Sequence, residues 1–373
     1  MKRIKLLFSL LLALSMYACN RNSDTNKEKN QFEKAEYAEL FEINKEETYT
    51  ELYVYSKEKK RKTKYILTSD RNQVKANDAV IIEVPVERII CLSTTHLGFL
   101  NRLGEQARVI GAGGTDYLYD SALRKAVKDG KISDIGYEGN LNREKIIELQ
   151  PDLLSLYEIA GENNSSAAMA KRYGLPHILI YEYAEASVLG QAEWIKVFGL
   201  LTGTEKRADS IFNEIKTKYE QLKQPVENVN KKPSVLLNMP WKGTWYIPSG
   251  QSNIAELIND AGGNYLWWEL EGRHNRPMNI ETVYEKAEDA DLWLNPGQAE
   301  SIEDIVTVDN RLANLKAMKT GNIYNRNARV SPTGGNDFME SGVVYPDRIL
   351  SDLITILHPD AHMDSLFYYK KLE

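Results

Sequence analysis

From about residue 79 onward, short apolar runs alternate with stretches whose apolar residues recur at helical spacing. Residues 88–92 and 292–294 are typical apolar runs, and residues 121–128 and 280–287 are typical helical stretches. Short apolar runs fit buried strands, and their alternation with helices is the signature of an α/β layer. We therefore predict an α/β fold with mainly parallel sheets.

Residues 187–224 interrupt this alternation because they contain no strand-like run. Gly203-Thr204 divides them into two helical pieces, and the second piece has one apolar face, formed by Ala208, Ile211, Phe212, Ile215, Tyr219 and Leu222. Pro225 ends this helix. The pattern predicts an N-terminal α/β lobe over 79–186 and a C-terminal α/β lobe over 225–373, joined by a long rigid helix.

The segment before residue 79 has a different pattern. Alternating and β-branched runs, clearest at 49–55 and 64–68, predict strands without intervening helices. We assign residues 36–78 to a small N-terminal β extension.

The first 18 residues have the three-part form of a signal peptide. A positive head precedes the apolar stretch 6–14, which is too short to span a bilayer comfortably. Ala18 then precedes Cys19, and this junction resembles a bacterial lipobox, in which the cysteine receives a lipid. The polar residues that follow read as a flexible tether over 19–35. This interpretation predicts a lipoprotein anchored to a membrane.

An ordinary signal peptide with a chance cysteine near its cleavage site is the alternative for Cys19. The chain has only 2 Cys, which excludes a disulfide framework and a Cys-based zinc site. If Cys19 is lipidated, Cys91 has no partner, and its apolar neighbours predict a small buried side chain.

Composition and charge narrow the possible ligands. The net charge of −6 argues against a nucleic-acid partner, which would require a basic face. The chain has 21 Tyr and 6 Trp against 8 Phe. Because Tyr and Trp combine an apolar body with a polar tip, this excess suits a hydrated binding surface.

A motif occurs once in each predicted lobe. The first copy begins at Asn142 with Glu144 two residues later, and the second begins at Asn279 with Glu281 two residues later. An Asp-Leu pair and an apolar run follow both copies. Each Asn can cap a helix, and each Glu then lies in the first turn, where the helix dipole favours negative charge. Local helix stabilisation explains this pattern, but two equivalent carboxylates could also engage a symmetric basic partner.

The order of these marks resembles the substrate-binding proteins of ABC importers for vitamin B12 and iron chelates (siderophores), over roughly residues 85–360. Further marks of the resemblance are Leu103-Gly104, Val109-Ile-Gly111, Ser249-Gly250, Ala261-Gly-Gly-Asn264, Pro346-Asp-Arg-Ile-Leu-Ser-Asp352 and His358-Pro359. The resemblance implies a ligand cleft between the lobes, a periplasmic location and an importer permease dimer as partner. It also implies that Glu144 and Glu281 dock onto arginines of the two permease subunits.

Aromatic and basic loops are the candidates for the ligand site. The resemblance favours Tyr117, Tyr119, Tyr137 and Arg276, which fall where the cleft loops of such proteins lie. Trp241 and Trp268 add flat faces that could hold a corrinoid or a bulky iron chelate, while Arg276 or Arg273 could meet acidic groups. The alternative is that some aromatics are core residues, which we expect of Trp245. The glycine-rich segment 333–338 is a candidate for the rim of the cleft.

The sequence therefore predicts a protein that binds a metal chelate, a ferric siderophore or a cobalamin-type corrinoid, and holds no cofactor of its own. One alternative is a protein that binds free zinc or manganese, although the five histidines show no clear metal-binding pattern. Another is an extracytoplasmic hydrolase, which would need a Gly-x-Ser-x-Gly nucleophile elbow that the sequence lacks. We predict no enzymatic activity.

Overall fold

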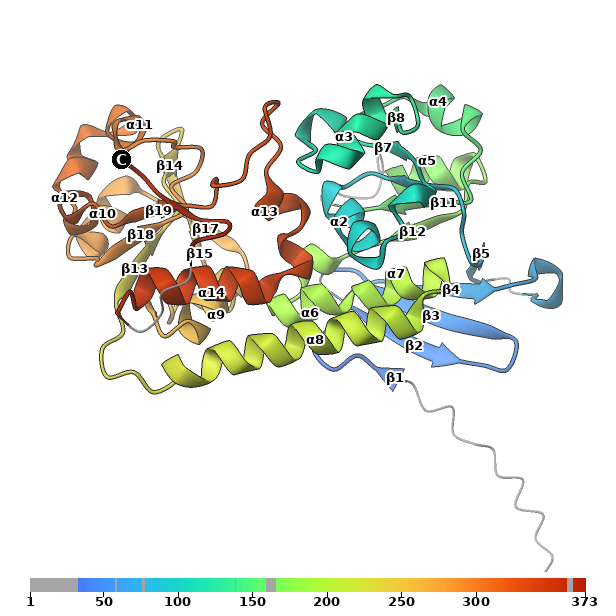
Figure 1. The fold of residues 1–373 in the computed structure, drawn as a ribbon, viewed down its shortest axis with the longest axis horizontal. Helices are drawn as coiled ribbons and strands as arrows, with labels where there is room; N and C mark the ends of the chain where they lie inside the picture. Colours follow the sequence, from blue (N-terminus) through green and yellow to red (C-terminus); the bar gives the residue numbers. More distant parts are fainter. Residues whose placement is uncertain (1–32, 58, 76–77, 138, 159–165, 361–364) are drawn as a thin grey trace, which may run out of the picture. The chain divides into compact units, whose positions relative to one another are not determined.

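The computed structural model describes residues 33–57, 59–75, 78–137, 139–158, 166–360 and 365–373, coloured from blue to red in Figure 1. The predicted signal peptide, Cys19 and almost all of the predicted tether lie outside the described residues. Glu33–Glu373 form one compact unit. Within the described ranges, no helix combines the length and the apolar character needed to cross a membrane.

The first lobe is built on a parallel five-stranded sheet with the order β12-β11-β6-β7-β8. Its strands are β6 (Ile89–Cys91), β7 (Val109–Ala112), β8 (Ser133–Asp134), β11 (Leu153–Leu156) and β12 (His177–Leu179). Its helices are α2 (Thr94–Leu103), α3 (Ser121–Lys128), α4 (Arg143–Glu148) and α5 (Ser166–Arg172). Every residue of β11 is buried, which explains why the strand reads as an unbroken apolar run.

The second lobe repeats this plan with the order β16-β13-β18-β19-β20. Its strands are β13 (Ser234–Leu237), β16 (Asn264–Tyr265), β18 (Leu292–Leu294), β19 (Ile323–Asn325) and β20 (Lys370–Lys371), of which only β20 is antiparallel to its neighbour. Its helices include α9 (Asn253–Asp260), α10 (Ile280–Ala287), α11 (Ile302–Val308) and α12 (Lys316–Thr320). The predicted α/β class with mainly parallel sheets is confirmed.

The two lobes share one strand order. When the edge strands β8 and β20 are left aside, the first lobe reads β7-β6-β11-β12 and the second reads β16-β13-β18-β19. The third of these four strands along the chain is β11 in the first lobe and β18 in the second. In each lobe the helix just before this strand, α4 or α10, begins with the repeated Asn-x-Glu motif. The sequence repeat therefore reflects a repeat of the fold.

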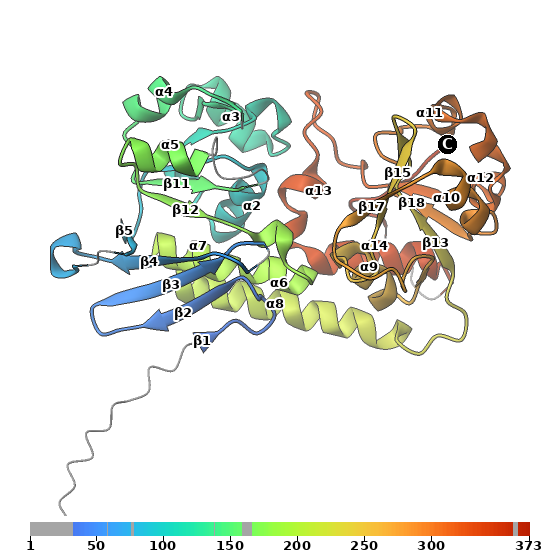
Figure 2. The same cartoon turned by 180° about the vertical axis from the view of Figure 1, so that it is seen from behind.

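Three helices link the lobes, where the sequence indicated two helical pieces. They are α6 (Val188–Glu193), α7 (Ile195–Thr202) and α8 (Glu205–Lys223). Gly203 ends α7 in a left-handed conformation with φ of 72°, which separates it from α8. The predicted apolar face of α8 is buried at Ala208, Phe212, Ile215 and Tyr219. Figures 1 and 2 show α14 (Pro346–Leu357) packed beside α8.

The N-terminal extension is a sheet with the order β1-β2-β3-β4-β5. Its strands are β1 (Glu33–Lys34), β2 (Phe41–Lys45), β3 (Tyr49–Tyr55), β4 (Lys62–Thr68) and β5 (Val80–Glu83). β5 looked like a strand of the first lobe, but it pairs in parallel with β4. The sheet of the extension therefore continues past residue 78.

Two buried carboxylates attach the extension to the linking helices and to the segment just before them. The carboxylate of Glu193 accepts hydrogen bonds from the backbone N–H groups of residues 36, 37 and 38, at 2.7–2.9 Å. The carboxylate of Glu185 accepts two more, from residues 39 and 40. The rings of Phe41 and Trp194 pack edge to face with centroids 5.1 Å apart. The extension is thus an integral part of the core rather than a loose addition.

After β19 the chain leaves the second lobe and packs against the first before it returns along α14. We call residues 326–345 the crossing segment; it contains α13 (Asp337–Glu340) and the 3₁₀ helix η8 (Gly342–Val344), both of which contact α2. Figure 2 shows α13 between the two lobes. A small antiparallel sheet, β14 (Pro240–Trp241), β15 (Thr244–Pro248) and β17 (Asn275–Met278), adjoins the second lobe.

Candidate functional site

Both copies of the repeated motif cap their helices as the sequence predicts. The Asn142 side chain accepts a hydrogen bond from the N–H of Lys145 at 3.0 Å, and the Asn279 side chain accepts one from the N–H of Thr282 at 2.8 Å. These bonds satisfy N–H groups that the first turn of a helix leaves without partners. Glu144 and Glu281 consequently lie in the first turns of α4 and α10.

The Asp of each motif also has one structural role in both lobes. Asp152 accepts hydrogen bonds from the N–H groups of Glu87 and Arg88, just before β6. Asp291 accepts hydrogen bonds from the N–H and hydroxyl of Ser234, at the start of β13. Each Asp therefore ties the strand that follows the motif to the first strand of its lobe.

The two candidate docking glutamates differ in their surroundings. Both are exposed. Glu281 forms an ion pair with Arg311 at 3.0 Å, and Arg311 also pairs with Asp309 at 2.6 Å. The backbone at the helix N-terminus and Arg311 together hold the pKa of Glu281 below its ordinary value. For Glu144, no ion-pair partner is found among the residues that the structure describes.

A cleft of about 920 Å³ is lined by residues of both lobes and of the crossing segment. In the first lobe its walls follow the carboxyl ends of strands: residues 92–94 follow β6, residues 113–117 follow β7 and Tyr157 follows β11. In the second lobe, residues 297–300 follow β18 and Arg326 follows β19. Ligand sites of α/β folds lie at this edge of the sheet.

The described cleft contains three of the chain's tyrosines. Tyr117 and Tyr137, both predicted from the sequence, line it with 67% and 63% of their surface exposed. Tyr157 lines it as well. Tyrosine rings exposed in a cleft offer apolar faces and hydroxyl donors to a bound molecule.

Arg326 and Glu300 are the charged residues that line the cleft. Within the described part of the chain, Arg326 has no acidic partner, and its guanidinium carbon lies 4.9 Å from the centre of the Phe338 ring. Burial lowers the pKa of Arg326 from its ordinary value. A partly buried guanidinium without a counter-ion is costly unless a ligand supplies negative charge.

The structure places Tyr119 outside the cleft, although it is close to Tyr117 in sequence. Tyr119 lines a separate pocket of about 210 Å³, together with Arg329 and Glu340. The Arg329 guanidinium carbon lies 5.1 Å from the centre of its ring. Leu118, which lies between the two tyrosines, is fully buried. Tyr117 and Tyr119 on either side of it line different pockets.

Trp241, Trp268 and Arg276 are not among the residues that line the cleft. Trp241 lies in β14 and Arg276 in β17 of the small sheet, and Trp268 lies in the turn after β16. Trp241 is 61% exposed, with the Lys242 ammonium 4.5 Å from the centre of its ring. The structure therefore does not bring these three residues together with Tyr117 and Tyr137. Trp245 is fully buried, as the sequence predicts for a core residue.

Cys91 and His96 are buried in the core, and part of the segment 333–338 lines the cleft. Cys91 is a free, buried cysteine, as expected of a core residue. His96 is fully buried and shares a hydrogen bond of 2.9 Å with the Ser155 hydroxyl. In the predicted rim segment 333–338, Gly334 and Asn336 do line the cleft.

Sequence reasoning missed Tyr157 and Arg326. Tyr157 directly follows the apolar run that comes after the first copy of the motif, so its place at a strand end was a usable signal. Arg326 follows β19, which is only three residues long and was too short to stand out as an apolar run.

Comparison with known proteins identifies the family. The profile of the periplasmic binding protein family matches residues 89–329, which begin after the N-terminal extension. An uncharacterised lipoprotein of Methanocaldococcus jannaschii is 27% identical over 290 residues, which are 75% of this chain and 67% of that protein. An uncharacterised ABC transporter substrate-binding lipoprotein of Bacillus subtilis is 23% identical over 187 residues, which are 49% of this chain and 56% of that protein.

Among solved structures, a periplasmic heme-binding protein of Pseudomonas aeruginosa superposes with a TM-score of 0.59 at 17% identity. The superposition covers 77% of this chain and 98% of that one. At this identity the match establishes a shared fold. Because the family profile spans more than half of the chain and both lobes, this protein belongs to the periplasmic binding protein family, a family of transport proteins rather than enzymes.

Proposed function

We propose that this protein is a lipid-anchored substrate-binding protein that captures a metal chelate and delivers it to the permease of an ABC importer. The family supports the binding role. The name of the Bacillus subtilis relative supports an ABC importer as partner, and two relatives named as lipoproteins support an extracytoplasmic location on a membrane anchor at Cys19. The signal-peptide pattern of the first 18 residues agrees with that location.

The observation that carries the ligand proposal is Arg326, a cation without a described counter-ion in a cleft that also contains three tyrosines. A volume of about 920 Å³ suits a molecule larger than a simple metabolite. Arg326 would pair with a carboxylate or catecholate of the chelate, and Tyr117 and Tyr137 would contact its flat or bulky faces. We therefore favour an anionic chelate, such as haem or a ferric catecholate, over a neutral corrinoid.

The test is a titration of the purified mature protein with haemin, a ferric tricatecholate, ferrichrome and cyanocobalamin, followed by tryptophan fluorescence. We expect the two anionic chelates to bind tighter than the two neutral ones. The chelate assignment fails if none of the four binds with a Kd below about 1 mM.

Replacing Arg326 distinguishes the proposed contact from a general loss of folding. Arg326→Ala should weaken binding of the anionic chelates by roughly 10- to 100-fold, because a charge-assisted hydrogen bond is lost, while ferrichrome affinity changes little. Arg276→Ala is the matched control, since Arg276 lies on the small sheet outside the cleft. Equal effects of the two substitutions would contradict the role of Arg326.

A protein for free zinc or manganese is the second candidate, and metal analysis decides between the two. Across the described residues there is no group of three or more His, Cys, Asp or Glu side chains placed to hold a metal ion. Stoichiometric zinc retained through dialysis, without chelate binding, would favour this candidate. We also propose that Glu144 and Glu281 dock onto basic residues of the two permease subunits.

A further inference from the structure

We infer that Glu340 is a positioning residue that holds residues 114–120, here called the cleft loop, against the crossing segment and so sets the spacing between two walls of the cleft. The cleft loop carries Tyr117, and the crossing segment carries Arg326. The ligand-binding consequence of this inference rests on the proposed function, whereas the loop geometry can be tested without a ligand.

The carboxylate of Glu340 joins two parts of the chain that are more than 200 residues apart. One of its oxygens accepts a hydrogen bond from the N–H of Tyr119 at 2.7 Å, and the other accepts one from the N–H of Asp120 at 3.0 Å. Glu340 is only 3% exposed. These two hydrogen bonds restrain the end of the cleft loop, because a buried N–H group that loses its acceptor is left without a partner.

Close backbone packing on both sides of Glu340 fixes where the carboxylate lies. Gly98 of α2 approaches the carbonyl oxygen of Glu340 so closely that a Cβ at position 98 would clash with it. Gly335 of the crossing segment similarly lies against the carbonyl oxygens of Tyr117 and Leu118. Glycine at these two positions allows the crossing segment to touch α2 and the cleft loop directly.

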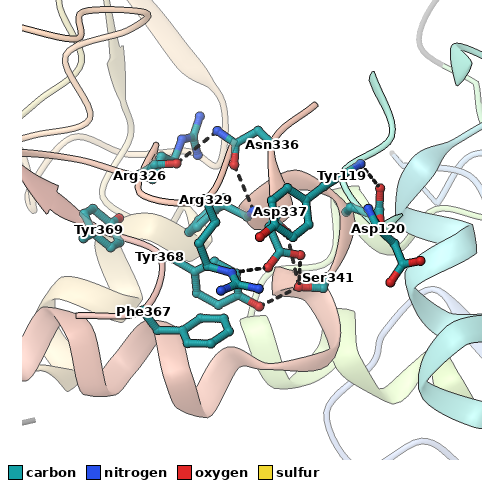
Figure 3. A network of polar contacts seen from close by, with 12 residues as sticks. Tyr119, Asp120, Arg326, Arg329, Asn336, Asp337, Ser341, Phe367, Tyr368 and Tyr369 are labelled. Atoms are coloured by element: carbon teal, nitrogen blue, oxygen red, sulfur yellow. Dashed lines mark hydrogen bonds and ion pairs between the residues drawn. The ribbon is translucent and has the colours of Figure 1, made fainter. Parts of the chain in front are cut away.

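The crossing segment is held rigid by polar contacts of its own, which Figure 3 shows beside Tyr119 and Asp120. Asp337 pairs with Arg329 at 2.5 Å and accepts a hydrogen bond from the hydroxyl of Ser341 at 2.7 Å. The hydroxyl of Ser341 also lies 2.7 Å from that of Tyr368. These contacts hold the crossing segment in one conformation. Because Glu340 belongs to this segment, its hydrogen bonds fix the cleft loop relative to the segment.

The restraint extends from the cleft loop to the second cleft tyrosine. The N–H of Gly114, at the start of the loop, donates a hydrogen bond to the carbonyl oxygen of Gly136 at 2.8 Å. Tyr137 follows Gly136 directly and lines the cleft. Because both ends of the cleft loop are tied, Tyr117 and Tyr137 face the Arg326 wall at a fixed separation.

Hydrogen–deuterium exchange of the ligand-free protein tests the geometry. In Glu340→Ala, the amides of Tyr119 and Asp120 should exchange roughly 10- to 100-fold faster, because both lose their hydrogen-bond acceptor. Glu340→Gln keeps one acceptor oxygen and should give an intermediate increase. Glu185→Ala is the matched control, since Glu185 is a buried glutamate that likewise accepts hydrogen bonds from two consecutive backbone N–H groups, those of residues 39 and 40, outside the cleft loop and the crossing segment. This variant should leave the amides of Tyr119 and Asp120 protected.

Binding of two probes of different shape tests the consequence for the cleft. Haemin and ferrichrome are titrated against the unmodified protein and the three variants. A general structural defect would lower the affinity for both probes by the same factor. A change in the spacing of the cleft walls should instead alter the ratio of the two Kd values by at least about fivefold in Glu340→Ala. In Glu340→Gln this ratio should return part of the way to that of the unmodified protein.

The possible outcomes separate this inference from the proposed function. If the unmodified protein binds neither probe, the exchange data still decide whether Glu340 holds the cleft loop. Unchanged exchange of Tyr119 and Asp120 in Glu340→Ala, or an equal acceleration in Glu185→Ala, would overturn the positioning role. An unchanged Kd ratio alongside accelerated exchange would overturn the link between Glu340 and the shape of the cleft.

Discussion

Glu182 illustrates how burial changes the pKa of a titratable side chain. It lies in the turn before α6, 4% exposed, and one of its oxygens has no described hydrogen-bond partner. Burial raises the pKa of Glu182 to about 8. The nearest ring nitrogen of His96 lies 3.9 Å from its carboxylate, but burial lowers the pKa of His96 to about 3, so the ring is neutral and supplies no counter-charge.

The raised pKa predicts how stability depends on pH. Because the folded state favours neutral Glu182, its contribution to stability is complete below about pH 4.5 and is lost as the pH rises through about 8. Glu182→Gln should therefore be roughly 2–4 kcal/mol more stable than the unmodified protein at pH 9, with little difference at pH 4. Urea denaturation across this range measures the difference. Parallel pH profiles for the two proteins would contradict the assignment, and exposed Glu227→Gln serves as the control.

At the residue scale, the sequence predicted part of the candidate site. Tyr117 and Tyr137 lie in aromatic loops where the resemblance to binding proteins implies the cleft, and both line the cleft of the structure. Tyr119 was expected in the cleft but lines another pocket. The direction in which a loop side chain points depends on tertiary packing, which the sequence pattern does not reveal. Arg326 required knowledge of β19, whose three residues carry too little pattern.

The N-terminal extension shows how an element can depend on a few side chains of another. Three backbone N–H groups of residues 36–38 donate to Glu193, which also pairs with Lys196 at 2.7 Å. Burial alone would raise the pKa of Glu193, but Lys196 and the backbone donors outweigh it and hold the pKa below its ordinary value. Ionised Glu193 therefore stabilises the attachment above about pH 4.5, and this stabilisation is lost as the pH falls through the lowered pKa.

Removing the charge of Glu193 should loosen the extension selectively. Glu193→Gln should cost about 2–4 kcal/mol, because three donors lose a charged acceptor and Lys196 loses its partner. Hydrogen exchange should accelerate for residues 36–38 and for the β1–β2 pair, while the second lobe exchanges as before. Exposed Glu227→Gln is again the control, and uniform acceleration throughout the chain would contradict a local attachment.

At the element scale, periodicity located long elements well and short ones poorly. Helices 121–128 and 280–287 and strand 49–55 have the predicted bounds, because amphipathic or alternating side chains occupy their full length. Strand β5 lies in a region where the sequence predicts strands, but its pairing with β4 could not be predicted, because strand pairing depends on tertiary contacts. The strand β17 was read as a loop because Arg276 and Pro277 leave no apolar run.

At the scale of the whole molecule, the duplicated lobes place Glu144 and Glu281 at equivalent positions. Each lies in the first turn of a capped helix, before the third strand of the shared order. Arg311 pairs with Glu281 but also with Asp309. A basic permease residue could thus take over Glu281 while Arg311 keeps a partner, so the ion pair is a small obstacle to docking.

Transport measurements test this docking. The double variant Glu144→Ala, Glu281→Ala should bind chelate with unchanged Kd but transport it at least about tenfold more slowly, because two permease cations lose their partners. Glu148→Ala with Glu285→Ala is the matched control, since these exposed glutamates lie four residues after Glu144 and Glu281, on the same two helices or at their ends. Arg311→Ala should leave transport within about fivefold of normal. Full transport by the first variant would exclude these glutamates as docking residues.

The shared strand order has a consequence for the symmetry of a partner that would bind both docking glutamates. A surface with two equivalent halves can be matched by a partner of twofold symmetry, in which one polypeptide contributes the same patch twice. Under the proposed docking of Glu144 and Glu281, a permease of two identical subunits would offer each glutamate an equivalent basic patch. Under the same proposal, the pairing of Glu281 with Arg311 gives the two docking glutamates different surroundings, by which two different permease subunits could be told apart.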